Sequence, residues 1–210
     1  MQAPIRSPED LSAFLKNGQR QFVRKNTVIY RQGELGSGFY YVEKGLVKIY
    51  TCSPAGDELN LDFRGKGHIF GELALIGEPY ISTAVAAEDA VLYYFTKERF
   101  KEMVKQNDMP LTLILNSLLV KLNILVETRL LTSAEQLIAH ALLKLAETAG
   151  HNRITVKQTD LANFTGLTRI TVNKTFQKWK KENIISVENK TIVIRDVNRL
   201  KSCLSAPENT

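Results

Sequence analysis

Cysteine, histidine and tryptophan are scarce in this chain of 210 residues, which has two cysteines, three histidines and one tryptophan. Cys52 and Cys203 lie far apart in the sequence. An iron–sulfur cluster is held by about four cysteines, so we expect no such cluster. A redox switch at Cys52 would need a thiol of lowered pKa, and nothing in the surrounding sequence indicates one. We interpret both cysteines as reduced thiols that behave as small apolar side chains.

Histidine scarcity argues against metal chemistry as well. His68 is the one histidine in the first half of the chain, whereas a cupin-like metalloenzyme places a cluster of histidine and glutamate side chains inside a barrel. Haem would need an axial ligand such as His68 or Cys52, and a histidine near a turn is more often solvated or hydrogen-bonded. No nucleophile triad, phosphate-binding glycine loop or carboxylate pair stands out. We therefore expect no haem, no metal and no enzymatic activity.

Long apolar runs are missing too. Residues 1–10 carry three charged side chains and two prolines, which is unlike a signal peptide. The most apolar stretch, Leu111–Val126, is interrupted by two asparagines and a lysine, so we interpret it as too short and too polar to span a bilayer. We expect a cytoplasmic protein with no membrane partner.

The formal net charge of +6 is confined to one end of the chain. Residues 1–150 contain 17 basic and 17 acidic side chains, whereas residues 151–210 contain 11 basic and five acidic ones. A basic terminal module beside a neutral body suggests a polyanionic partner, most often nucleic acid. A basic surface that only keeps the protein soluble explains the same charge. A sequence motif is therefore needed to choose between these two interpretations.

Residues 22–95 have the pattern of short strands. Runs of β-branched and aromatic residues, such as 27–30, 39–42 and 46–50, alternate with glycines. Short strands with regular turn signals are typical of a β-sandwich or barrel. A helical pattern follows over residues 96–106.

The sequence pattern then changes to that of a long helix. Apolar or long side chains are spaced 4, 3, 4, 3 and 4 residues apart, at Leu111, Leu115, Leu118, Leu122, Leu125 and Arg129. This spacing is typical of a dimer-forming helix. Ile114, Leu119, Ile124 and Val126 widen the apolar surface, so one side can face a second copy and the other the barrel. A core helix of a monomer has the same pattern, but we expect a homodimer.

A further helix is predicted from residue 133 to about Thr148, with a boundary over residues 149–152. Thr132 and Ser133 mark a break and an N-cap, and Glu135 suits the first turn. Gly150 supplies the left-handed residue that ends many helices. This helix would connect the dimer helix to the basic end of the chain.

Residues 155–179 have the pattern of a helix-turn-helix. Thr155 and Gln158 have the spacing of a capping box. Gly166 stands where the turn needs positive φ, and Thr168 is a good N-cap for the second helix. The two helices would turn one apolar face inward, formed by Leu161, Ala162, Phe164, Val172, Phe176 and Trp179.

The outward face of the second helix predicts a DNA reader, with its N-terminal residues in the major groove. Arg169 suits a bidentate contact to guanine, and Ile170 suits the methyl group of thymine. Lys174 can reach a base or a phosphate. The other expected DNA contacts are Thr168, Thr171, Asn173, Lys157, Gln158 and Lys178, with Lys180 and Lys181 as further phosphate candidates. For each lysine alone, a solvated surface charge is an equally good interpretation.

With two short strands around a turn at Asn189 as a wing, the chain resembles the Crp/Fnr family of regulators over nearly its whole length. Phe70–Leu75 resembles the phosphate-binding cassette of cyclic-nucleotide-binding domains, and Gly166–Arg169 with Lys190–Val193 resembles the family's winged helix. The resemblance implies an α+β fold with a double-stranded β-helix (jelly-roll) sensor domain in residues 1–107, a dimerisation helix in 108–131 and a winged helix-turn-helix in 132–210.

The resemblance also implies how the protein acts. Family members bind palindromic double-stranded operators as homodimers and contact RNA polymerase. We expect half-sites about 10 base pairs apart, and activation of transcription, with repression left open. Ile170 stands where many members have a glutamate that accepts from cytosine, and Lys174 where arginine is common. The operator is therefore expected to differ from the usual family consensus.

The cassette departs from the family's pattern. The expected effector pocket consists of Gly71, Glu72, Leu73, Ile81, Ser82, Thr83, Leu122 and Asn123. Ile81 stands where cyclic-nucleotide-binding members have an arginine that pairs with the phosphate, so that charge is missing. Family members that bind cAMP read its adenine with a threonine and a serine on the dimer helix. When the family's pattern is aligned at Leu142–Leu143 and extended toward the N-terminus without gaps, these two positions fall on Leu122 and Asn123. We expect a small effector other than cAMP, or a vestigial pocket.

Overall fold

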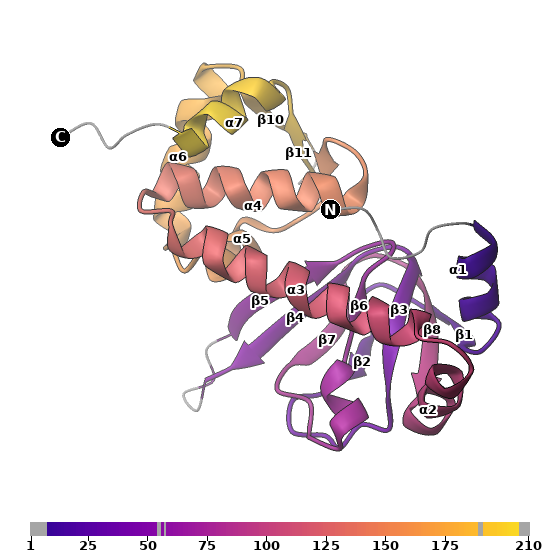
Figure 1. The fold of residues 1–210 in the computed structure, drawn as a ribbon. Helices are drawn as coiled ribbons and strands as arrows, with labels where there is room; N and C mark the ends of the chain where they lie inside the picture. Colours follow the sequence, from indigo (N-terminus) through magenta and orange to yellow (C-terminus); the bar gives the residue numbers. More distant parts are fainter. Residues whose placement is uncertain (1–7, 54–55, 57, 189–190, 206–210) are drawn as a thin grey trace. The chain divides into compact units, whose positions relative to one another are not determined.

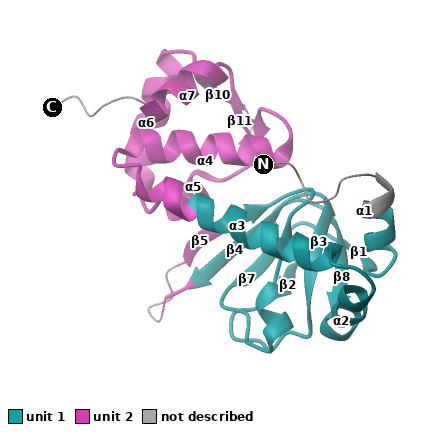
Figure 2. Ribbon diagram, in the orientation of Figure 1, with its two compact units in different colours: residues 1–51, 63–124 teal, residues 52–62, 125–210 magenta. Residues whose placement is uncertain are grey.

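The computed structural model describes residues 8–53, 56, 58–188 and 191–205. The chain divides into two compact units (Figure 2). One unit consists of residues 1–51 and 63–124, and the other of residues 52–62 and 125–210. The predicted turn at Asn189, with Lys190, lies outside the described residues.

Two four-stranded sheets are formed by the first half of the chain (Figure 1). Their strand orders are β1-β8-β3-β6 and β2-β7-β4-β5. The strands are β1 (Gln19–Val23), β2 (Val28–Tyr30), β3 (Gly38–Lys44), β4 (Val47–Cys52), β5 (Glu58–Arg64), β6 (Ile69–Phe70), β7 (Thr83–Ala86) and β8 (Ala90–Thr96). Most neighbours in the two sheets are far apart in the sequence, as in the antiparallel pair of β1 and β8. The two sheets agree with the sandwich or barrel that the strand pattern predicts and with the jelly-roll fold that the family resemblance implies.

The turn between β3 and β4 shows why glycine punctuates the strands. Gly45 has a φ of +89°, and a Cβ there would lie 2.4 Å from the backbone oxygen of Asp89. A larger residue would both strain the backbone and collide with the neighbouring turn. The glycine therefore brings the two turns together and sets the start of β4.

Three helices pack against the sheet that contains β3, β6 and β8. They are α1 (Pro8–Leu15), α2 (Lys97–Gln106) and α3 (Met109–Arg129), and η1 (Glu72–Ile76) is a short 3-10 helix. One apolar cluster joins the helices to the strands and contains Phe14, Phe39, Tyr41, Ile69, Phe95, Met103, Leu113 and Ile114. α2 begins at its N-cap Thr96, whose side chain accepts a hydrogen bond from the Arg99 backbone N–H. The sequence-predicted helix over residues 96–106 is confirmed.

α3 has two different apolar sides. Leu113 and Ile114 are buried in the cluster just described. The residues of the predicted seam are exposed, from 43% at Leu111 to 58% at Leu125. α3 is also long and apolar enough to cross a membrane, by length and composition alone. Our interpretation of this stretch as too short and too polar is therefore wrong, because the helix extends beyond the stretch from Leu111 to Val126.

The second unit contains a helical core and a small sheet. Its helices are α4 (Ala134–Ala149), α5 (Gln158–Thr165), α6 (Arg169–Lys181) and α7 (Val197–Ser205). Its strands, β9 (Arg153–Ile154), β10 (Ile185–Glu188) and β11 (Thr191–Ile194), pair in the order β10-β11-β9. β10 and β11 are the two strands of the expected wing. At the start of α4, Ser133 and Gln136 form a reciprocal capping box, and Gly150 ends the helix in the left-handed conformation.

Candidate nucleic-acid interface

Two helices and a tight turn form the candidate reader. α5 ends at Gly166, which has a φ of 69°. The backbone N–H of Leu167 then donates to the Ala162 carbonyl oxygen at 3.1 Å, which reverses the chain within a few residues. Thr168 caps α6 by accepting from the backbone N–H of Thr171 at 3.1 Å. The predicted turn and second N-cap are confirmed.

The start of α5 differs from expectation. Its N-cap is Lys157, which makes no side-chain capping bond. Thr155 lies before the helix, and its hydroxyl contacts that of Thr191 on β11. The predicted capping box between Thr155 and Gln158 is therefore wrong, because β9 and β11 hold Thr155 beside the sheet and α5 begins only at Gln158.

A dry core fixes the position of α6. Val172 and Trp179 have no exposed surface, and Phe176 is 1% exposed. Leu161 and Ala162 of α5 are buried as well. Close-packed interiors resist small displacements. The buried side chains of α6 therefore fix the position of the helix and of the side chains on its exposed face.

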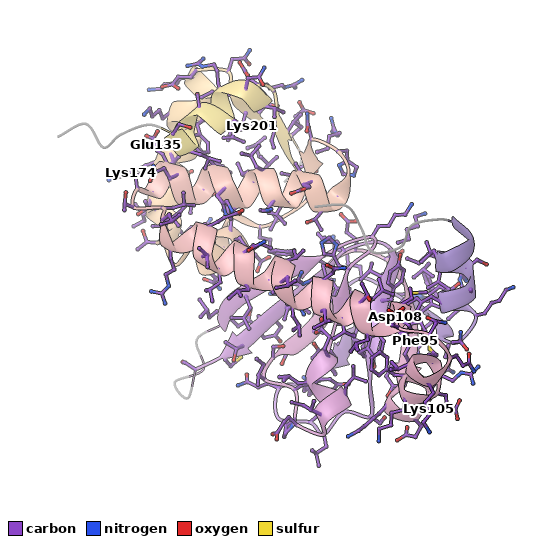
Figure 3. The ribbon with its side chains drawn as sticks, viewed as in Figure 1. Phe95, Lys105, Asp108, Glu135, Lys174 and Lys201 are labelled. Atoms are coloured by element: carbon purple, nitrogen blue, oxygen red, sulfur yellow. The ribbon has the colours of Figure 1, made fainter. Side chains whose placement is uncertain are left out.

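The opposite side of α6 carries most of the expected DNA contacts. Arg169, Asn173 and Lys174 are exposed, and Ile170 is 69% exposed. An isoleucine so exposed is unfavourable in water, and a contact with a thymine methyl group would cover it. Thr168 and Lys157 are exposed too, while Thr171 and Gln158 are half-buried. Figure 3 shows Lys174 projecting from this unit.

One residue of this face was not among the predicted DNA contacts. Gln177 is exposed and lies seven residues, about two turns, after Ile170. The helical period beyond Lys174 was the signal that would have found it. Its amide can donate and accept, as contacts with base edges or phosphates require.

Lys178 occupies a different position from the other lysines of α6. Its Nζ donates to Oε1 of Glu135 in the first turn of α4, at 2.6 Å. The hydrogen bond to Glu135 raises the pKa of Lys178, which secures its charge. This phosphate candidate is therefore already paired with a carboxylate.

The wing is anchored by charged side chains. Glu188 of β10 accepts from Arg195 at 2.5 Å and lies 3.5 Å from Arg153. Such exposed pairs add little stability singly, but they connect β9, β10 and the end of β11. The sheet thus supports the reader from one side.

In the first unit, the expected effector pocket is only partly assembled. Ser82 and Thr83 are buried, but Ile81 is 66% exposed. Leu122 is 55% exposed and Asn123 is exposed too. The helical residues that reach η1 are Ser117, whose hydroxyl donates to Glu72 at 2.8 Å, and Lys121, whose ammonium contacts the same carboxylate. The residues of α3 predicted for the pocket were Leu122 and Asn123, which remain a prediction, whereas the residues seen to contact Glu72 are Ser117 and Lys121.

Aromatic rings fill the space beside these residues. Tyr30 stacks on Tyr80 with ring centroids 3.8 Å apart, and Tyr40 stacks on Phe70 at 5.1 Å. Burial raises the pKa of Tyr30, whose hydroxyl is hydrogen-bonded to Ser82. Burial likewise raises the pKa of Tyr40 to about 12. These hydroxyls are therefore neutral donors at physiological pH and offer no charge to a ligand.

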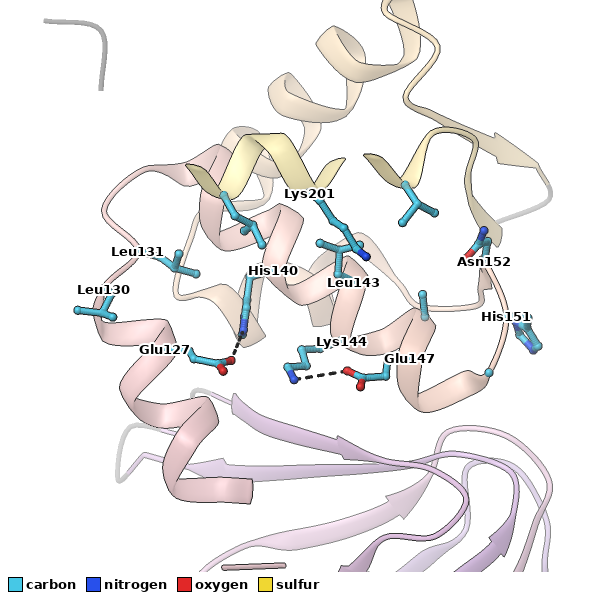
Figure 4. A pocket seen from close by; sticks show the side chains of 14 residues that line it. Glu127, Leu130, Leu131, His140, Leu143, Lys144, Glu147, His151, Asn152 and Lys201 are labelled. Carbon is cyan, nitrogen blue, oxygen red and sulfur yellow. Dashed lines mark hydrogen bonds and ion pairs between the residues drawn. The ribbon is translucent and has the colours of Figure 1, made fainter. Parts of the chain in front are cut away.

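The second unit has a cavity of about 880 Å³ beside α4 and α7 (Figure 4). Its lining includes the apolar side chains of Leu131 and Leu143. Among the lining residues, Nε2 of His140 lies 3.5 Å from Glu127, and Lys144 donates to Glu147 at 3.4 Å.

The two cysteines differ in their exposure to solvent. Cys52 is exposed and Cys203 is half-buried. Burial raises the pKa of Cys203, which lowers its thiolate fraction. Over the residues that the structure describes, no three His, Cys, Asp or Glu side chains are grouped to hold a metal ion.

Comparisons with known proteins match both units. Residues 20–107 match the cyclic nucleotide-binding domain family, and residues 136–203 match the Crp-like helix-turn-helix domain. The chain is 26% identical over 199 residues to the cyclic AMP receptor protein of Thermus thermophilus, covering 93% of this chain and 92% of that one. It is 26% identical over 188 residues to the anaerobic regulatory protein of Haemophilus influenzae, covering 85% and 73%.

Solved structures share the fold. A CRP/FNR family transcriptional regulator from Thermus thermophilus superposes with a TM-score of 0.75 at 26% identity, covering 90% of this chain and 99% of that one. FixK2 from Bradyrhizobium japonicum superposes with a TM-score of 0.79 at 20% identity, covering 90% and 98%. The order of a β-rich domain, a long helix and a helix-turn-helix with a small sheet is common to them and to this chain.

Proposed function

Because this chain belongs to the Crp/Fnr family of DNA-binding transcription regulators, we propose that it binds a palindromic operator as a homodimer and is gated by a small effector other than cAMP. The family consists of regulators rather than enzymes. The observation that carries the proposal is the exposed face of α6, where polar, basic and apolar side chains stand on a buried core. We place the protein in the cytoplasm with its DNA.

Base reading rests on the first turn and a half of α6. Arg169 would read guanine and Ile170 a thymine methyl group, while Asn173 and Lys174 reach bases or phosphates. Each good bidentate contact discriminates by about 1–3 kcal/mol. Ile170 offers no acceptor, so a cytosine at its position would gain nothing. The operator would therefore differ from sites read by members with glutamate there.

Dimerisation rests on the exposed seam of α3. The leucines at positions 111, 115, 118, 122 and 125 are each between 43% and 58% exposed in the single chain. Two copies of this helix would cover them, at about 25 cal/mol for each Å² of apolar surface removed from water. A two-fold dimer then presents two readers, which matches a palindrome with half-sites about 10 base pairs apart.

Effector gating is proposed from the cassette. A relative bears the name cyclic AMP receptor protein, but here Ile81 stands where the phosphate-pairing arginine belongs. Glu72 already accepts from Ser117 and Lys121. A ligand would have to compete with these donors and would thereby shift α3. In the proposed organisation α3 forms the dimer helix (108–131), which joins the sensor (1–107) to the reader (132–210). An effector acts only if it binds the two states of the dimer unequally.

Contact with RNA polymerase, with activation as the output, completes the proposal. It follows from the family alone. In vitro transcription from a promoter that carries the selected operator would measure it, with an increase or a decrease in transcript separating activation from repression.

Selection from random duplex DNA tests the proposal. Purified protein would be incubated with the pool at one physiological salt concentration, because phosphate contacts make affinity steeply salt-dependent. Enrichment of a two-fold symmetric site is the expected result. No enrichment, either alone or with cell extract and candidate ligands, would refute the proposed mode of DNA reading.

A further inference from the structure

The ion pair between Glu135 and Lys178 links the first turn of α4 to the third turn of α6. The Nζ–Oε1 distance is 2.6 Å, and the two side chains are 38% and 51% exposed. Glu182 also raises the pKa of Lys178, but it has its own partner in Arg199 at 3.5 Å. Glu135 is therefore the carboxylate that holds the Lys178 ammonium. Figure 3 shows Glu135 at the start of α4.

Lys178 lies on the flank of α6 rather than at the centre of its outward face. A helix turns about 100° for each residue. Ile170, Lys174 and Gln177 therefore cluster on one side, opposite the buried side chains of Val172 and Trp179. Lys178 falls between the two sides, on the flank where α4 packs. With α6 in the major groove, the flanks of the helix are where the phosphate backbones run.

We propose that Glu135 withholds Lys178 from the DNA backbone and so limits the affinity of the reader for DNA. The inference rests on the proposed function, since it concerns the same DNA-binding face. A carboxylate at the edge of the interface acts twice. It occupies the ammonium that would neutralise a phosphate, and it repels that phosphate itself. A reader tuned in this way leaves non-specific DNA more readily, because the affected contact carries no sequence information.

The pair is not needed to hold the fold together. An exposed ion pair contributes at most about 1 kcal/mol. The start of α4 is already capped by Ser133 and Gln136. Glu135 can therefore be neutralised while α4 and α6 remain in place, and the effect on DNA affinity can be measured by itself.

The test uses the chain of 210 residues and a matched control. Glu135→Gln removes the carboxylate that holds the Lys178 ammonium. Glu147→Gln makes the same charge change on the same helix, but breaks the pair with Lys144 instead. The double variant E135Q/K178Q removes the freed ammonium. Dissociation constants would be measured on the selected operator and on a scrambled duplex at several salt concentrations, with thermal unfolding of each variant as a check on folding.

The expected result is a tighter complex for E135Q. One additional phosphate contact makes the slope of log affinity against log salt steeper by about 0.9. Affinity at low salt should rise about fivefold over E147Q, on both duplexes, as expected for about 1 kcal/mol. The double variant should return to the slope of E147Q. If E135Q instead weakens binding, Glu135 orients Lys178 toward the DNA. If E135Q and E147Q have the same affinity and salt dependence, the ion pair has no effect on DNA binding. Either result overturns the inference. A wild-type protein that binds no duplex would refute the proposed function itself.

Discussion

The ammonium group of Lys121 on α3 contacts the carboxylate of Glu72 in η1, and the Ser117 hydroxyl donates to the same carboxylate at 2.8 Å. Only 11% of the Glu72 side chain and 29% of the Lys121 side chain are exposed. A carboxylate this far from water depends on such donors. The cassette is therefore attached to the long helix by charge as well as by apolar packing.

Replacing Lys121 with methionine should destabilise the protein by about 2 kcal/mol, because it leaves Glu72 partly buried without its cation. The double variant E72Q/K121M should recover most of this loss, since no charge remains to be compensated. Arg20→Met breaks the exposed pair with Glu43 and should change stability little. Urea denaturation measures all three. Equal losses for K121M and the double variant would contradict the prediction.

Phe176→Ala should destabilise the reader by about 3–5 kcal/mol, because it opens a cavity in a core where Phe176 is 1% exposed. Trp179, the only tryptophan of the chain, lies three residues away and reports unfolding by fluorescence. Ile170→Ala on the exposed face should shift the transition within about 0.5 kcal/mol. A small effect of Phe176→Ala would mean that the core of the reader relaxes around the missing ring.

Arg169→Ala should weaken binding to the selected operator about tenfold to a hundredfold, through loss of a bidentate base contact. Binding to a scrambled duplex should change much less, so the ratio of the two affinities falls. Lys201→Ala on α7 serves as a control with the same loss of one charge. Equal weakening on both duplexes would show that Arg169 contacts phosphates rather than a base.

The double variant L118E/L122E should be monomeric in sedimentation experiments, because it places like charges on the exposed seam of α3. Its operator affinity should fall strongly, as each reader would then bind a half-site alone. Leu35→Glu, at a leucine that is 77% exposed on the first unit, should leave the oligomeric state unchanged. A wild-type protein that is monomeric at micromolar concentration would refute the dimer outright.

Alkaline stability should depend on Tyr40, whose pKa burial raises from 10.0 to about 12. Above pH 10 the unfolded chain releases this proton while the folded chain keeps it, so unfolding becomes more favourable as pH rises toward 12. Below pH 10 the contribution of the buried hydroxyl is fully present. Tyr40→Phe should therefore unfold at a higher pH than the wild type when circular dichroism is followed against pH. Identical midpoints would assign alkaline unfolding to other groups.

Local signals in the sequence predicted most of the fold. Glycine at 166 and threonine at 168 act through their own backbone geometry and hydrogen bonds, so the turn of the reader follows from those residues alone. Thr155 has equally good local spacing, but its place in the structure is decided by the sheet. A capping pattern that competes with strand pairing cannot be judged without knowing the tertiary neighbours.

The candidate sites were predicted unevenly for a related reason. The outward face of α6 follows from a period of 3.6 within one helix. The partners of Glu72 and of Lys178 lie on other elements, 45 or 49 residues away for Glu72 and 43 for Lys178. Pairs at such separation depend on how helices pack, and no spacing in the sequence specifies them.

The pairing of β9 with β11 places the two reading helices inside a loop of chain that its last strand must close. During synthesis, α5 and α6 leave the ribosome before β11 does. The first unit closes its own sheet when β8 pairs with β1, long before that. The nascent protein should therefore fold its sensor while its reader is still unable to bind DNA, and DNA binding should begin only after β11 has been synthesised and paired.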